Sequence, residues 1–187
     1  MSKVLRNLGA ADNDTILLVD DADVLLGTAP KLDVHRRGLK HRAVSALVRN
    51  PQGKMLLQRR APGKYHSEGL WTNACCSHPR PDESNSDAAS RRVMEEMGVD
   101  CELTPLFIAR YRAAVSNDLI EDEVVHVFGG TFDGTVAPDP KEASDWKWMP
   151  FEELLADLAA NPARYSVWFR HYLEHHRDAI AKWMQPS

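Results

Sequence analysis

The chain has 187 residues, of which 43% are hydrophobic and 27% are charged, as in an ordinary folded globular protein. Its net charge of −4, from 23 basic and 27 acidic side chains, argues against a nucleic-acid-binding surface, which needs a basic excess. Three cysteines, two of them adjacent, argue against a disulfide framework, and no apolar run reaches the length of a membrane span or a signal peptide, so we expect a cytoplasmic protein that does not bind membranes.

The first part of the chain predicts strands and a turn. Residues 1–14 are polar and are expected to be flexible. Thr15–Asp20 has the apolar, β-branched composition of a strand, as do Ala43–Arg49 and Lys54–Arg59. The latter two flank Asn50–Gly53, whose Asn, Pro and Gly are typical of a hairpin turn.

A loop rich in Gly, Pro and His, residues 61–81, precedes the clearest helix of the chain. The sequence NSDAASRRVMEEMG, residues 85–98, has candidate N-caps at Ser84, Asn85 and Ser86 and ends at a glycine that favours helix termination. Its apolar side chains recur at spacing four, at Ala89, Val93 and Met97.

The rest of the chain predicts further strands and then helices. The strands are Leu106–Ala113, Glu123–Gly130 and Asp145–Met149. Pro150 precedes a predicted helix, residues 151–160, and residues 166–183 are expected to form one final helix. Strands and helices in this order predict one layered α/β (α+β) domain over residues 1–187.

The segment Trp71–Pro79, WTNACCSHP, combines thiols with an imidazole. A thiol two residues from His78 suits an acid/base group beside a metal ligand, but it also suits a buried free cysteine beside a loop histidine. A structural zinc at Cys75, Cys76 and His78 is disfavoured because a second Cys/His pair at zinc-finger spacing is missing.

Histidines and an acidic run offer a candidate metal site. His35 and His41 precede the predicted strands, and Glu121 and Glu123 point to the same face of a strand because side chains alternate. Imidazoles and carboxylates bind Mg²⁺, Mn²⁺ or Zn²⁺. The alternative is a solvated strand end, in which water separates the two like charges.

The central helix carries Arg–Glu pairs at spacing four, in the less favourable order for a surface pair. Instead, Glu96 would suit a divalent ion held against a phosphate, and Arg92 would suit a phosphate oxygen. Further positive charge for a diphosphate is available from Lys31, Arg60 and Lys64.

The helix and its upstream loop resemble a degenerate Nudix box. Ser77 replaces the leading glycine, and Glu83 and Glu96 keep the spacing. Arg92 stands where Nudix hydrolases have a metal-binding glutamate, which argues against pyrophosphate hydrolysis. The same departures occur in the type 1 isopentenyl-diphosphate delta-isomerases, which the chain resembles from about Thr15 to Trp168. The motifs that carry this resemblance are RRAPGK at 59–64, WTNACCSHP at 71–79, YR at 111–112 and EDE at 121–123.

The resemblance implies a Nudix-like α/β/α sandwich with a mixed β-sheet, and roles for individual residues. The implied catalytic residues are Cys76, Glu123 and Tyr111. The implied ligands of a Mn²⁺, Mg²⁺ or Zn²⁺ ion are His35, His41, His78, Glu121 and Glu123. A second ion, Mg²⁺, is implied at Glu96 and the backbone carbonyl of Cys76. The residues implied to bind the diphosphate are Lys31, Arg60, Lys64 and Arg92, and Trp168 with Tyr111 is implied to line the hydrocarbon end.

The implied reaction interconverts isopentenyl and dimethylallyl diphosphate and feeds isoprenoid biosynthesis. The substrate is a small prenyl diphosphate, and the expected oligomeric state is a monomer or homodimer. The alternative is a Nudix pyrophosphohydrolase acting on a nucleoside diphosphate derivative.

Overall fold

The computed structural model describes residues 15–185, so the flexibility expected of residues 1–14 lies outside the described residues. The elements in chain order are β1 (Thr15–Val19), β2 (Leu25–Pro30), α1 (Lys31–Arg37), β3 (His41–Arg49), β4 (Lys54–Arg60), β5 (Trp71–Thr72), β6 (Cys75–Ser77), α2 (Asn85–Met97), β7 (Leu103–Ala114), β8 (Ile120–Thr131), β9 (Ala143–Pro150), α3 (Phe151–Ala160), a 3-10 turn (Pro162–Arg164), α4 (Val167–His175) and α5 (Arg177–Met184).

The described strands form one mixed sheet centred on β3. This strand pairs antiparallel with β1, β4 and β6 and parallel with β8. The turn at Asn50–Gly53 forms as predicted, but β3 and β4 pair only beside it, at Arg49 and Met55. Beyond that point the two strands diverge, and β5 pairs with β4 while β6 pairs with β3. The segment 71–78 therefore lies where the central strands separate.

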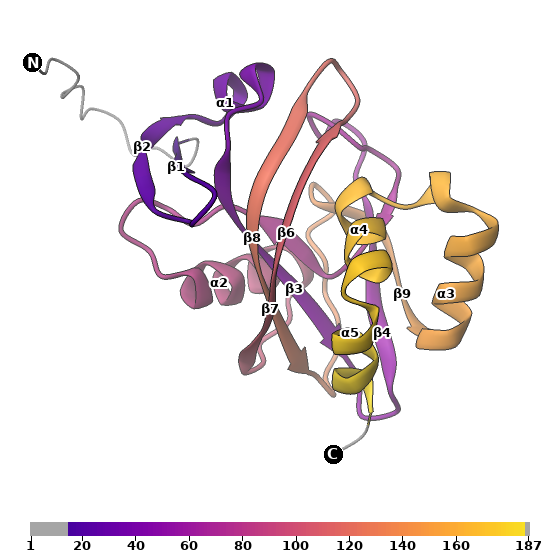
Figure 1. Cartoon of the computed structure of the whole chain (residues 1–187). Coiled ribbons are helices and arrows are strands. Elements are labelled where there is room, and N and C mark those ends of the chain that lie inside the picture. Colours follow the sequence, from indigo (N-terminus) through magenta and orange to yellow (C-terminus); the bar gives the residue numbers. More distant parts are fainter. Residues whose placement is uncertain (1–14, 186–187) are drawn as a thin grey trace, which may run out of the picture.

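Helices cover both faces of the sheet (Figure 1). On one side Val93 and Met97 of α2 pack with β3, β4 and Cys75. On the other side α3, α4 and α5 pack through a core that includes Leu154, Phe169 and Ile180. The predicted sandwich with a mixed sheet is confirmed. No helix within residues 15–185 has both the length and the apolarity needed to cross a membrane.

Helix α2 begins and ends as the sequence predicts. The Ser84 hydroxyl accepts a hydrogen bond from the Asp87 amide at 3.1 Å and so caps the first turn. Gly98 ends the helix at φ 63, and a Cβ there would lie 2.6 Å from the carbonyl oxygen of Ala137. The predicted apolar stripe is buried, and Glu96 is buried beside it.

Two parts of the sequence prediction were wrong or incomplete. Residues 166–183 form two helices, because His176 leaves helical geometry (φ −124, ψ 22) and its ring stacks on Phe107 of β7 at 4.2 Å. Strand β2 and helix α1 were not predicted, nor were the short strands β5 and β6, which lie in the segment 61–81 that was predicted to be a loop. Helix α1 is short, seven residues, and lacks a side-chain N-cap, so it carries few local helix signals.

Candidate active site

Separate segments bring histidines and carboxylates to one end of the sheet. His35 lies on α1, His41 begins β3, His78 follows β6, and Glu121 and Glu123 lie on β8. The parallel register of β3 and β8 pairs His41 with Glu123. Strand alternation then places Glu121 on the same face. The structure therefore brings together all the residues that the sequence suggested as ligands of the first metal ion.

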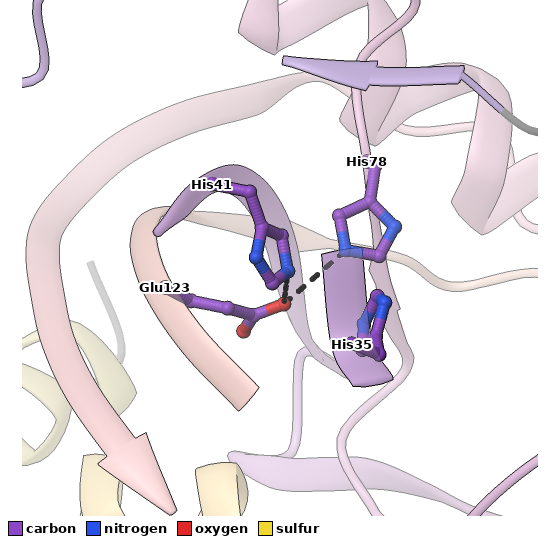
Figure 2. A group of neighbouring side chains, drawn as sticks. All are labelled: His35, His41, His78 and Glu123. Atoms are coloured by element: carbon purple, nitrogen blue, oxygen red, sulfur yellow. Dashed lines mark ion pairs between the residues drawn. The ribbon is translucent and has the colours of Figure 1, made fainter. Parts of the chain in front are cut away.

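The imidazoles surround the two carboxylates at close range. His41 Nε2 and His78 Nε2 each lie 3.3 Å from Glu123 Oε1, and His35 Nε2 lies 3.4 Å from Glu121 Oε2. Figure 2 shows the three rings gathered around Glu123. Glu121 and Glu123 are each 3% exposed, so they do not form the solvated strand end that was the alternative.

The protonation states of the two glutamates and of His78 suit metal binding, whereas the pKa of His41 is raised, because contact with Glu123 outweighs burial. Burial raises the pKa of Glu121, but contacts with His35 and His66 outweigh it and hold this pKa well below its ordinary value. The pKa of Glu123 is also lowered, because contacts with His41 and His78 outweigh burial and the charge of Glu121. Burial lowers the pKa of His78 to about 3, so its ring is neutral at pH 7. Metal ions bind ionised carboxylates and neutral imidazoles.

Several buried polar atoms of this cluster have no hydrogen-bond partner within residues 15–185, namely His41 Nε2, His78 Nε2 and Glu121 Oε2. The Nδ1 atoms of His35 and His41 lie 2.7 and 2.8 Å from backbone carbonyl oxygens, which fixes the Nε2 atoms toward the cluster. Buried polar atoms without partners are costly, and a cation would satisfy them. The donor set fits a divalent metal ion with nitrogen and oxygen ligands.

The adjacent thiols point into different environments because they alternate along β6. Cys75 is fully buried among Ala46, Val93 and Met97, beneath α2. Cys76 packs against the opposite core and lines a cavity of about 40 Å³ together with Glu123. Burial raises the pKa of the Cys76 thiol well above its ordinary value, and the charges of Glu123 and Glu121 raise it further. The thiol is therefore protonated at neutral pH.

Two aromatic residues suggested by the sequence also line this cavity. The Tyr111 hydroxyl donates a hydrogen bond of 2.6 Å to Glu123 Oε2, the oxygen other than the one beside His41 and His78. Trp168 is 2% exposed, and the guanidinium of Arg60 lies over its ring, 5.2 Å from the ring centre. An apolar ring and a cation thus meet at the same wall of the cavity.

Basic side chains form the rest of the wall, namely Lys31, Arg60, Lys64 and Arg92. Arg92 pairs with Glu96 at 2.8 Å and with Glu142 at 3.3 Å, and Lys64 also pairs with Glu142. Burial lowers the pKa of Lys31, and the charges of Lys64 and Arg92 lower it further. A neighbouring cavity of about 390 Å³ shares Lys31, Lys64 and Arg92, so the cations face space that an anion can enter.

The site contains residues that sequence reasoning missed. His66 and Tyr65 line the cavity, and His66 contacts Glu121. Both lie in the loop 61–81, where only RRAPGK and WTNACCSHP were singled out, although a histidine beside a lysine-containing motif was a usable signal. Glu142, which pairs with Lys64 and Arg92, lies 78 and 50 residues away from them, and no local pattern marks it.

Comparisons with known proteins agree with this geometry. Residues 39–169 match the NUDIX domain. The isopentenyl-diphosphate Delta-isomerase 2 of Aromatoleum aromaticum is 51% identical, over 83% of this chain and 82% of its own length. The isopentenyl-diphosphate Delta-isomerases of Burkholderia multivorans and Serratia proteamaculans are 48% and 46% identical, over 86% and 84% of this chain and 92% and 88% of theirs.

Solved structures share the fold at lower identity. The Deinococcus radiodurans protein DR0079 superposes with a TM-score of 0.65 at 22% identity, over 79% of this chain and 90% of its own. A MutT protein from Methanosarcina mazei gives a TM-score of 0.59 at 24% identity, over 74% of this chain and 94% of its own.

Proposed function

The chain belongs to the isopentenyl-diphosphate Delta-isomerase family of NUDIX-domain proteins, and we propose that it interconverts isopentenyl and dimethylallyl diphosphate through Cys76 and Glu123. The observation that carries these roles is that the two groups line one cavity in opposite protonation states. The Cys76 thiol holds its proton, whereas the Glu123 carboxyl is ionised. Moving a double bond requires one group that donates a proton and another that accepts one.

The reaction adds a proton to the terminal alkene carbon and removes a proton from the carbon two positions away. The intermediate is a tertiary carbocation, which water would trap. Cys76 and Glu123 exchange these protons with the substrate. Because one group loses a proton and the other gains one, the total charge of the pair is unchanged after the transposition.

The two oxygens of Glu123 serve different partners. Oε1 faces His41 and His78, and Oε2 accepts the hydrogen bond from Tyr111. We assign proton transfer to Oε2, since Oε1 faces the metal-ligand cluster. A divalent ion held by His35, His41, His78, Glu121 and Glu123 would fix the carboxylate and offset the repulsion between the two glutamates. Its identity as Mn²⁺, Mg²⁺ or Zn²⁺ stays a prediction.

Aromatic side chains protect the carbocation. Trp168, which is 2% exposed, and Tyr111 line the cavity, and a desolvated cation–π contact contributes about 2 kcal/mol. Arg60 lies over the Trp168 ring. A five-carbon substrate is short, so its two ends lie close together. Arg60 can therefore bind the diphosphate end while Trp168 contacts the hydrocarbon end.

The basic wall holds the diphosphate. Lys64 and Arg92 pair with Glu142 and line both cavities, where charge-assisted hydrogen bonds to phosphate oxygens would replace these ion pairs. Glu96 is buried, and its oxygens contact Arg92 and Gln58. We propose that it holds Mg²⁺ with the carbonyl oxygen of Cys76 and phosphate oxygens. Remote binding of this kind fixes a small alkene for reaction.

Hydrolysis is the second candidate, because the NUDIX domain also occurs in hydrolases such as those with solved structures. The position of Arg92 disfavours it. Its guanidinium pairs with Glu96 and Glu95 at 2.8 Å, so a cation occupies the place on α2 where a hydrolase needs a further carboxylate. A cytoplasmic location and a monomeric or homodimeric state remain predictions.

The deciding experiment incubates the protein with isopentenyl diphosphate and Mg²⁺, with and without chelator, and follows dimethylallyl diphosphate by NMR. Nucleoside diphosphate derivatives are tested in parallel for released phosphate. Isomerisation that chelator abolishes and restored metal recovers is expected. Phosphate release without isomerisation would instead identify a hydrolase.

A further inference from the structure

His66 lies outside the proposed ligand set but contacts it. Its side chain is 3% exposed, and its Nε2 lies 2.7 Å from Glu121 Oε1. This oxygen is not the one that faces the other histidines: His35 and His41 lie 3.4 and 3.8 Å from Glu121 Oε2. The two oxygens of Glu121 therefore have separate partners.

The distance between His66 Nε2 and Glu121 Oε1 is that of a hydrogen bond, whereas the distances among the proposed metal ligands are longer. Nitrogen and oxygen atoms that share a metal ion, each about 2.1 Å from it, are held apart at roughly 3 Å or more. The 3.3–3.8 Å separations of His35, His41 and His78 from the carboxylates are of this kind. A separation of 2.7 Å matches an N–H donated to a carboxylate.

The His66 ring is fixed from several sides. Its Nδ1 lies 3.1 Å from the Ser67 hydroxyl, which can donate to it, so that Nε2 carries the proton. Its carbonyl accepts a hydrogen bond of 3.1 Å from Arg60, and its ring meets Trp168 edge-on at 5.7 Å. The Ser67 amide in turn donates to the Ser116 hydroxyl at 2.9 Å. These contacts leave His66 little freedom to turn away from Glu121.

We propose that His66 is a positioning residue that holds Glu121 Oε1 and thereby makes Glu121 a one-oxygen ligand through Oε2. The inference rests on the proposed metal site. Without His66, Glu121 is free to rotate and to bind the ion through both oxygens or through neither. With it, the ion would receive a single oxygen from each glutamate and three imidazole nitrogens, since His35, His41, His78 and Glu123 form one cluster and Glu121 Oε2 lies 3.4 Å from His35.

The test measures Mn²⁺ binding by competition with a chromophoric chelator in the wild-type chain and in His66→Ala, His66→Gln and His126→Ala. His126 is the matched control. It lies on β8, the strand that also carries Glu121 and Glu123, but its Nε2 contacts Asp23, at 2.7 Å, and no glutamate of the cluster. Loss of a hydrogen bond to a metal ligand weakens metal affinity about 10–100-fold. We expect that loss in His66→Ala, a smaller one in His66→Gln, whose amide can still donate, and none in His126→Ala.

Pulsed EPR of the Mn²⁺-loaded proteins separates positioning from direct ligation, because it detects the coordinated imidazole nitrogens. The signals from coordinated nitrogen should be the same in wild type and His66→Gln. Loss of one nitrogen coupling would make His66 a ligand and overturn the proposal, as would unchanged Mn²⁺ affinity in both His66 variants. If His66→Ala fails to fold, as judged by circular dichroism, His66→Gln decides. Failure of the wild-type chain to bind Mn²⁺ would overturn the metal site itself, a distinct outcome.

Discussion

At the scale of single residues, the alternation of one short strand separates two neighbouring thiols. Cys75 and Cys76 are consecutive on β6, yet Cys75 belongs to the core beneath α2 and Cys76 to the wall of the cavity. A free cysteine in a core acts as a small apolar side chain, whereas a thiol beside ionised carboxylates is a proton donor. Substitution of each should therefore have a different consequence.

We predict that Cys76→Ala keeps the fold but loses turnover by about 10²–10⁴-fold, the range for an acid/base group. Cys76→Ser should be nearly as inactive, because a hydroxyl is far less acidic than a thiol. Cys75→Ala should keep its rate and lose stability on the order of 1 kcal/mol, since it leaves a small void among Val93 and Met97. Steady-state kinetics and urea unfolding of the three variants provide the test. An inactive Cys75→Ala together with an active Cys76→Ala would reverse the assignment.

Tyr111→Phe should slow turnover and shift its pH dependence. The Tyr111 hydroxyl donates to Glu123 Oε2 at 2.6 Å, and a donor to the ionised form lowers a carboxyl pKa. Its removal therefore raises the pKa of Glu123, so activity should begin to fall at a higher pH on the acidic side of the profile. Profiles of kcat/KM for both proteins measure this. A loss of rate with an unshifted acidic limb would restrict Tyr111 to lining the cavity.

The sequence indicated most of the site residues but not all of their contacts. Local spacing showed that Cys76 lies close to His78 and that Glu121 and Glu123 share a strand face, but it was the family resemblance that assigned their roles. His66 was missed because its partner Glu121 is far away in the chain and meets it only through the folded loop. Glu142 was missed for the same reason.

At the scale of elements, the loop before α2 is tied to the helix by a two-point ion pair. Arg91 Nε lies 2.6 Å from Glu83 Oε1, and a second guanidinium nitrogen lies 2.8 Å from Oε2. The same carboxylate accepts the amide of Arg80 at 3.0 Å. This arrangement fixes the segment that follows His78, and so the approach of that histidine to the site.

Glu83→Gln should therefore lower the free energy of unfolding by about 1 kcal/mol at pH 7. The hydrogen bond from Arg91 holds the pKa of Glu83 below its ordinary value of 4.5. Because the pKa of Glu83 is lower in the folded than in the unfolded chain, the ionised carboxylate stabilises the fold fully above pH 4.5. This stabilisation is lost as the pH falls through the lowered folded-state pKa. Urea unfolding at pH 7 and near pH 3 should show the difference between wild type and variant shrinking in acid.

Glu95→Gln is the control, because Glu95 also pairs with arginines of α2, at 3.2 Å from Arg91 and 2.8 Å from Arg92, but its side chain is 42% exposed. This substitution should lower the free energy of unfolding at pH 7 by less than Glu83→Gln does. A cost for Glu83→Gln that is the same at both pH values would show that the ion pair contributes nothing.

Elements with strong local signals were predicted well, and those fixed by distant contacts were not. Helix α2 has a cap, an apolar stripe and a terminal glycine, and its bounds agree with the prediction. Strand β6 has only three residues and exists because the diverging strand β3 offers it a free edge. The break at His176 depends on Phe107, which lies on β7. Neither partner is visible from the local sequence.

At the scale of the whole molecule, the candidate metal ligands join elements that the chain separates widely. They extend from His35 on α1 to Glu123 on β8, and they meet because β3 pairs with both β8 and β6 while α1 precedes β3. Without a cation, two ionised carboxylates lie buried on one strand face, which opposes folding. Metal binding should thus stabilise the entire fold and not the local cluster alone.

We predict that chelator-treated protein melts at a lower temperature than protein given Mn²⁺ or Zn²⁺. A ligand that binds only the folded state at 100 times its dissociation constant adds about 2.7 kcal/mol, or roughly 5–10 °C for a chain of this size. His41→Ala should abolish most of the rise, because it removes a buried ligand from the centre of the cluster. His175→Ala, at an exposed position on α4, is the control and should keep the full rise. Thermal unfolding by circular dichroism measures the difference, and an equal rise in both variants would mean that the ion stabilises the protein from another site.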